Sequence, residues 1–236
     1  PWPDFYLPAG FRETMRNPQG FTLVELLVSM ALLSIVLGIL LTTQSTVIGS
    51  SMTQQTNAVR LGVITDISGY VADRIKAAAL LPDGVTLNGA SCQRSPTSGL
   101  PCLAAVVPQV DATGQINTWE LHAFQYVDPA GLAVLERTPG LTGVNVALRE
   151  LVLVSTCAQT VPTSATLATC FSGIPSTSLL SDELALPASG TAAFEYDSAQ
   201  RLVMLRLRSV SLQNGAPAYL PANGSYALKV YARNVP

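Results

Sequence analysis

The residues able to support catalysis or bind a metal are few in this chain of 236 amino acids. Its single histidine, His122, lies in the strand-like run WELHAFQY, and no nearby motif marks a nucleophile that it would activate. The sequence contains no G-x-S-x-G elbow, no phosphate-binding loop and no cluster with the spacing of metal ligands. We therefore predict no catalytic residue, no metal site and no cofactor, and we expect the chain not to be an enzyme.

The charge is nearly balanced, with 13 lysines and arginines against 15 aspartates and glutamates. Broad nucleic-acid binding requires clustered positive charge, so a nucleic-acid partner is possible but not indicated. The one basic cluster comprises Arg201, Arg206 and Arg208, which we interpret as the exposed face of a strand; a contact to a partner subunit or to a DNA backbone is the alternative. The hydrophobic content of 48% argues against a disordered chain.

The most unusual stretch is apolar and lies near the N-terminus. Residues Leu26 to Leu41 read LLVSMALLSIVLGILL, and with residues 21–24 they give about twenty residues, enough for a helix to cross a bilayer. Arg12 and Arg16 precede this segment, which places the N-terminus in the cytoplasm. We predict a single membrane helix with an extracytoplasmic C-terminal domain. A plain signal anchor, a cleaved secretory signal and a buried core helix are the alternatives.

One carboxylate, Glu25, interrupts the beginning of this apolar stretch. An ionised carboxylate in hydrocarbon costs several kcal/mol unless it is paired, so such a residue indicates a function. Between Arg16 and Arg60 the sequence contains no lysine or arginine. The partner of Glu25 must therefore come from elsewhere, or the carboxyl group must stay protonated.

The segment Gly20-Phe21-Thr22-Leu23-Val24-Glu25, followed by the apolar run, resembles the class III signal of type IV pilins and pseudopilins. The resemblance implies that a prepilin peptidase cleaves between Gly20 and Phe21 and N-methylates the new terminal Phe21. Glu25 is then the fifth residue of the mature chain, where the family pairs it with the terminal amine of a neighbouring subunit. That amine would be the missing cation.

The apolar pattern changes its period after the membrane segment. Apolar residues recur at spacings of three and four up to the breaker Pro82-Asp83-Gly84, which predicts an amphipathic helix with the stripe Val59, Val63, Ile67, Tyr70, Val71, Ile75 and Ala78. Arg60 is expected on another face. We divide the chain into a leader (1–20), a transmembrane or filament-core helix (21–42), an amphipathic helix (43–81) and an extracytoplasmic β-rich globular domain (82–236).

Short β-like runs follow Pro82, separated by segments rich in Pro, Gly, Ser and Thr. The patterns predict strands at 103–107, 118–127, 133–137, 144–155, 192–196, 201–211 and 226–233. Residues 197–200 are expected to form a hairpin turn. We interpret 84–101, 156–191 and 212–224 as surface loops or subunit contacts. The predicted fold class is α+β and pilin-like, with the long N-terminal helix packed on a mainly antiparallel sheet.

All the cysteines, Cys92, Cys102, Cys157 and Cys170, follow the membrane segment. An even number of cysteines outside the cytoplasm favours disulfides, and free thiols are the main competitor. Among the possible pairings, the local one joins Cys92 to Cys102 and Cys157 to Cys170. A metal site would require tighter spacing and histidine partners.

The resemblance implies a structural role, most similar to a larger minor pilin of a type IV pilus or related filament. Implied partners are the prepilin peptidase, other pilins or pseudopilins, and an inner-membrane assembly platform. The precursor would lie in the cytoplasmic membrane before joining a pilus or pseudopilus. A type II secretion pseudopilin and a minor pilin of a DNA-uptake (competence) pilus are alternatives. A membrane-anchored binding module that never polymerises is the alternative from a different class.

Overall fold

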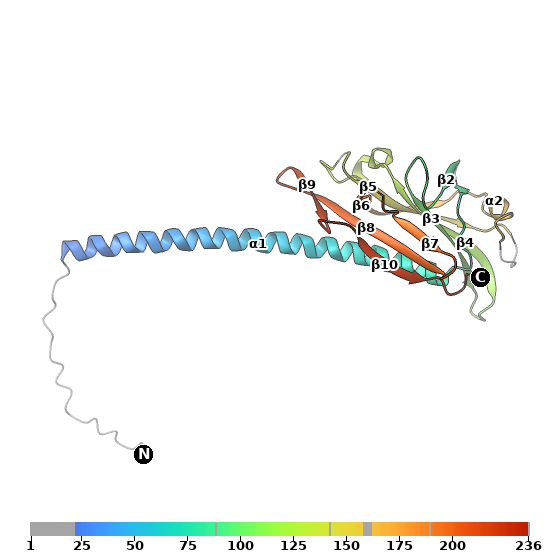
Figure 1. Ribbon diagram of the computed structural model, residues 1–236, viewed down its shortest axis with the longest axis horizontal. Helices are drawn as coiled ribbons and strands as arrows, with labels where there is room; N and C mark the ends of the chain where they lie inside the picture. The colour runs from blue at the N-terminus through green and yellow to red at the C-terminus, as the bar shows by residue number, and fades with distance from the viewer. Residues whose placement is uncertain (1–21, 88, 142, 158–161, 189, 236) are drawn as a thin grey trace, which may run out of the picture. The chain divides into compact units, whose positions relative to one another are not determined.

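The computed structural model describes residues 22–235 except 88, 142, 158–161 and 189 (Figure 1). The chain divides into two compact units, residues 1–53 and 54–236, and one long helix, α1 (Leu23–Ala77), contributes to both. A β-rich fold follows α1, and its described residues include three short helical turns. The expected α+β architecture is therefore confirmed.

The part of α1 within the first unit is apolar on all sides. Its large hydrophobic side chains, from Leu23 to Met52, are exposed. It includes a stretch long and apolar enough to cross a membrane, as the sequence predicted.

The part of α1 within the second unit is amphipathic and packs on the sheet. Its buried residues recur at helical spacing: Arg60, Ile64, Ile67, Ser68, Val71, Ala72 and Ile75. The predicted stripe is therefore wrong in part, because Val59, Val63 and Tyr70 are exposed and Arg60 is buried. Arg60 fits this face because its guanidinium donates to the Ser209 hydroxyl at 3.0 Å and to the Ser209 and Ala218 carbonyls at 3.0 and 2.8 Å.

The main sheet is antiparallel and follows the order β10-β8-β6-β5-β4-β3, with β7 and β9 also paired to β8. Its strands are β3 (Cys102–Val110), β4 (Ile116–Val127), β5 (Val146–Val154), β6 (Ser176–Ala185), β7 (Phe194–Asp197), β8 (Leu202–Gln213), β9 (Ala216–Leu220) and β10 (Tyr226–Tyr231). The short strands β1 (Val85–Leu87) and β2 (Ala90–Cys92) form a separate hairpin. The small helical elements are η1 (Pro129–Gly131), η2 (Val134–Glu136) and α2 (Leu167–Cys170).

The predicted strands agree with the observed ones except at four places. Residues 133–137 form the 3-10 turn η2, because Arg137 folds back and donates to the carbonyls of Ala130 and Leu132. The β1–β2 hairpin and the strands β6 and β9 lie in segments predicted to be loops. The predicted hairpin is confirmed: β7 pairs with β8, and the Asp197 carboxylate accepts hydrogen bonds from the backbone of the turn.

Both faces of the central strands are covered. On one face, α1 packs against a core that includes Leu103, Phe124, Leu148 and Leu205. On the other face, Trp119 and Leu121 pack beneath the β1–β2 hairpin and the segment around α2. Parts of the segments 84–101 and 156–191, expected as surface loops, thus cover the second face of the sheet. This explains why β3 is buried along most of its length.

Much of the outer edge of strand β3 is hydrogen-bonded to other segments of the chain. The Cys102 N–H donates to the Gln93 carbonyl at 2.8 Å. Val106 forms two hydrogen bonds with residues 79–80, which directly follow α1. Pro108 has no N–H to offer a further strand. This edge is therefore protected against pairing with another chain.

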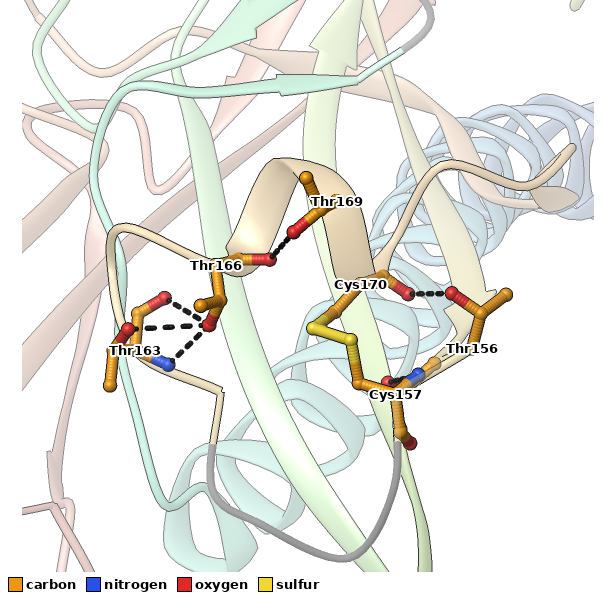
Figure 2. Close-up of a disulfide and its surroundings, with 7 residues drawn as sticks. Thr156, Cys157, Thr163, Thr166, Thr169 and Cys170 are labelled. Atoms are coloured by element: carbon orange, nitrogen blue, oxygen red, sulfur yellow. Dashed lines mark hydrogen bonds between the residues drawn. A yellow bond between two sulfur atoms is a disulfide. The ribbon is translucent and has the colours of Figure 1, made fainter.

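Two disulfides fix the covering segments, and their pairing is the local one among those that the sequence left open. Cys92 joins Cys102, and Cys157 joins Cys170 (Figure 2). Around the second disulfide, the Thr156 N–H and hydroxyl both bond the Cys170 carbonyl, at 2.9 and 3.2 Å. Each disulfide is part of the core on the second face of the sheet, because Cys92, Cys102 and Cys170 are buried there.

Replacing either cysteine pair by alanine should lower the free energy of unfolding by about 2–4 kcal/mol, because the crosslink restricts the unfolded chain. Alanine keeps the buried position apolar, so the loss reports mainly the crosslink. Urea unfolding of the purified protein in detergent measures the effect. A midpoint unchanged in both double variants would contradict the structural role assigned to the disulfides.

Candidate functional site

The carboxylate of Glu25 closes the beginning of α1. The Thr22 hydroxyl accepts a hydrogen bond from the Glu25 N–H at 3.3 Å, and the Glu25 Oε2 atom accepts one from the Thr22 N–H at 3.2 Å. The Thr22 hydroxyl also donates a hydrogen bond to the Glu25 Oε2 atom, at 3.1 Å. This reciprocal arrangement is a capping box, which satisfies N–H groups that a helix leaves unpaired at its beginning.

The capping box provides Glu25 with local partners that were not expected from the sequence. A carboxylate at a helix N-terminus is favoured by the helix dipole, and two local donors now hydrogen-bond it. These donors are neutral, however, and the segment between Arg16 and Arg60 still provides no cation. The spacing Thr-x-x-Glu at residues 22–25 signals this cap in the sequence, and our sequence reasoning missed it.

The hydroxyl groups of the apolar part of α1 are satisfied within the helix. Ser29 donates to the Glu25 carbonyl at 2.7 Å, and Ser34 donates to the Met30 carbonyl at 2.8 Å. Thr42 and Thr43 donate to carbonyls one turn earlier, at 2.6–3.1 Å. Such bonds let polar residues lie in an apolar environment without a partner from another chain. An ionised Glu25 differs from these groups, because hydrogen bonds within the helix do not neutralise its charge.

Gly20 and Phe21 lie outside the described residues, so cleavage between them and methylation of Phe21 stay predictions. The described helix begins two residues after Phe21, at Leu23.

The single histidine belongs to a partly buried polar cluster between α1 and the sheet, in which His122 and Glu150 are the buried members. The Nδ1 atom of His122 lies 2.7 Å from the Glu150 carboxylate, and its Nε2 atom lies 3.2 Å from the Glu120 carboxylate. From α1, the Tyr70 hydroxyl donates to Glu150 at 2.8 Å. Arg74 stacks on the Tyr70 ring at 5.3 Å. The cluster therefore ties one helix to two strands.

The side chain of His122 is enclosed by these partners. Its side chain is only 2% exposed, and both ring nitrogens face carboxylates. A neutral imidazole donates one hydrogen bond, whereas an imidazolium donates to both carboxylates at once. The sequence interpretation of His122 as a strand residue rather than a base is consistent with its position in β4.

The partners of Glu150 determine its ionisation. Burial by itself raises the pKa of this carboxyl group, but hydrogen bonds from His122 and Tyr70 outweigh burial and hold the pKa below its usual range. Burial, together with the Glu150 carboxylate, raises the pKa of the Tyr70 hydroxyl. Glu150 therefore accepts hydrogen bonds as an ion, and Tyr70 donates one as a neutral phenol.

Two members of the basic cluster are engaged within the chain. Arg206 forms an ion pair with Glu195 at 2.8 Å and donates to the Ala192 carbonyl. Arg208 stacks on the Tyr219 ring at 4.1 Å and donates to the Ala222 carbonyl. Arg201 lies in the β7–β8 turn with a φ of 52°. Arg206 and Arg208 thus lie on β8 as predicted, half-buried rather than exposed, whereas Arg201 lies in the turn before the strand.

The chain matches a known family over residues 15–41, the prokaryotic N-terminal methylation motif. Searches of curated proteins and of solved structures return no match. The matched residues include Thr22, Glu25 and the beginning of the apolar helix. The chain is thus similar to type IV pilin-like prepilins, and its helix-and-sheet architecture is consistent with a pilin fold. The motif implies processing by a prepilin peptidase and assembly with other pilins.

Replacing Glu150 by glutamine should weaken the attachment of α1 to the sheet. A carboxylate with a lowered pKa in the folded state contributes stability above its unfolded pKa, and this contribution is lost as the pH falls through the folded pKa. We expect Glu150→Gln to lower the free energy of unfolding near neutral pH by about 1–3 kcal/mol and to flatten its decline below about pH 5. Urea unfolding at several pH values measures both effects.

Glu195→Gln is the matched control, since it removes an exposed carboxylate from the same domain. The role assigned to the cluster is wrong if the free energy of unfolding of Glu150→Gln falls with decreasing pH as steeply as that of the unmodified protein.

Proposed function

We propose that this chain is a structural subunit of a type IV pilus or a related filament and not an enzyme. The observation that carries the proposal is a lone carboxylate at the beginning of an exposed apolar helix, inside a matched methylation motif. In the proposed pathway the precursor is inserted with its N-terminus in the cytoplasm, is cleaved between Gly20 and Phe21 and is methylated at Phe21. An inner-membrane platform then assembles it with other pilins.

Glu25 has a defined task in this proposal. Cleavage creates an α-amino group on Phe21, and the amine of a neighbouring subunit supplies the cation that residues 17–59 lack. An ion pair between Glu25 and this amine fixes the position of the neighbouring subunit, because an uncompensated charge in an apolar environment costs several kcal/mol. The exposed apolar part of α1 then packs against other helices in the filament rather than against lipid.

The assignment to a minor pilin stays a prediction. It is supported by the size of the β-rich domain, in which two disulfide-bonded segments add a second layer on the sheet. A type II secretion pseudopilin and a competence pilin would use the same N-terminal chemistry. An anchored binding module would not need Glu25, so the Glu25 variants separate it from all filament subunits.

Glu25→Ala should lower filament incorporation by at least about tenfold while membrane insertion is kept, because removing one member of a buried ion pair costs about 3–5 kcal/mol. Glu25→Gln should be nearly as defective, because glutamine can retain the capping box but not the charge. Thr22→Val should have the milder effect of losing a cap, about 1 kcal/mol. Immunoblots of sheared filaments and of membranes from the same cells measure the two pools.

Asp66→Ala serves as the control, since Asp66 is an exposed carboxylate on the same helix. Filament incorporation of Glu25→Ala at the level of this control would contradict the proposed function and favour an anchored binding module.

A further inference from the structure

Val59 and Val63 form an apolar patch on the part of α1 that packs on the sheet. The two side chains are 62% and 39% exposed, and they are neighbours on the helix surface because they lie one turn apart. The sequence predicted both residues in the buried stripe, whereas the buried face begins at Arg60. Packing within the described residues therefore leaves both positions exposed although each is apolar.

Gly62 lies beside both valines on the exposed side of α1. Apart from proline, glycine is the least favourable residue in the interior of a helix. A Cβ atom added at Gly62 would meet no atom of another element within 4 Å among the described residues, so contacts within the chain do not require a glycine here. A glycine on a helix surface lets a second helix approach closely, because no side chain separates the two backbones.

Lipid does not reach the apolar patch in the proposed membrane orientation. Residues 21–41 fill the hydrocarbon core of a bilayer, which is about 30 Å thick. Val59 follows Leu41 by 18 residues, which corresponds to about 27 Å along a helix that rises about 1.5 Å per residue. The patch therefore lies well outside the hydrocarbon, and only a protein surface is left to cover it.

The spacing of the exposed apolar residues along α1 indicates which protein surface fits. Val59 follows Ile48 by 11 residues, and Val63 follows Met52 by the same number. Eleven residues make close to three turns, so the members of each pair lie on nearly the same face of an α-helix. Ile48 and Met52 are exposed in the apolar part of α1, which the proposed function assigns to packing against other helices. The same kind of partner, a long helix, therefore fits the apolar patch.

We propose that Val59, Gly62 and Val63 pack against helix α1 of a second copy of this chain. This inference rests on the proposed filament function and deepens it by naming residues beyond the membrane segment that join neighbouring copies. Arg60, between the two valines, is hydrogen-bonded to the backbone of β8 and β9. A contact at the apolar patch therefore also fixes the position of the β-rich domain relative to the neighbouring helix.

The test is photo-crosslinking of the full-length chain in its native membrane, with two differently tagged copies expressed together. The photoreactive residue p-benzoylphenylalanine replaces Val59 or Val63. Leu61 is the matched control position, because it is 48% exposed on the same helix but lies on another side, since two residues turn a helix by about 200°. We expect crosslinks from positions 59 and 63 to α1 of the other tagged copy. Their yield should exceed that of position 61 at least about tenfold, the factor that burial of one valine side chain supplies.

Two glycine variants separate this contact from the stability of the helix. Gly62→Leu introduces a better helix former at an exposed position, so the domain should unfold at the same or a higher urea concentration. Its bulky side chain should nevertheless lower filament incorporation at least about tenfold by keeping the two helices apart. Gly69→Leu is the matched control, because a Cβ atom there also meets no atom of another element within 4 Å among the described residues, but Gly69 lies outside the patch. It should assemble like the unmodified chain.

Equal crosslinking yields at positions 61 and 63 would overturn the proposal, as would crosslinks to the β-rich domain of the other copy, to a different protein or to lipid. If Gly62→Leu assembles normally while Glu25→Ala does not, the contact at the apolar patch is wrong and the filament function stands. If both variants assemble normally, the filament function fails together with the contact.

Discussion

The contact between the C-terminal part of α1 and the sheet is the interaction on which the rest of the domain depends. One face of the helix, from Arg60 to Ile75, closes the core formed by β3, β4, β5 and β8. Arg60 fixes this face to β8 and β9 by hydrogen bonds to backbone carbonyls. Further along the helix, Tyr70 fixes it to β4 and β5 through the Glu150–His122 pair. Because these polar contacts are directional, they determine which face of the helix meets the sheet, whereas apolar packing alone tolerates more rotation.

The apolar side chains on the other face of the sheet also need a cover, which loop segments provide instead of a helix. Trp119, Leu121 and Leu153 would be exposed if the chain contained only α1 and the sheet. The β1–β2 hairpin and the segment around α2 cover them, and each carries a disulfide that compensates for its short regular structure. The α1 segment from Leu23 to Met52 has no such cover within the described residues. It therefore requires lipid or other helices, and this requirement connects the fold to the proposed assembly.

Local patterns in the sequence predicted the long helix, most strands, the β7–β8 hairpin and the presence of disulfides, but left the disulfide pairing open. Local patterns did not predict the features that depend on residues distant in the sequence. Arg60 is buried because Ser209 and Ala218 offer acceptors, and no local pattern reveals this. Strand β6 begins with serine- and threonine-rich sequence, and β9 contains Pro217, so neither shows clear alternation. His122 was recognised as a strand residue, but its two carboxylate partners follow from strand register and helix rotation. Glu25 was identified from its type and surroundings, whereas the Thr22 cap was overlooked.

The central claim is that processing creates the cation that Glu25 lacks. Mass spectrometry of the N-terminus of the protein recovered from its native membrane tests this claim most directly. Our account predicts a chain that begins at Phe21 and carries one methyl group on its terminal amine. An intact N-terminal segment preceding Phe21, or a terminus beyond Leu41, would contradict the account, because the amine that pairs with Glu25 would then not exist.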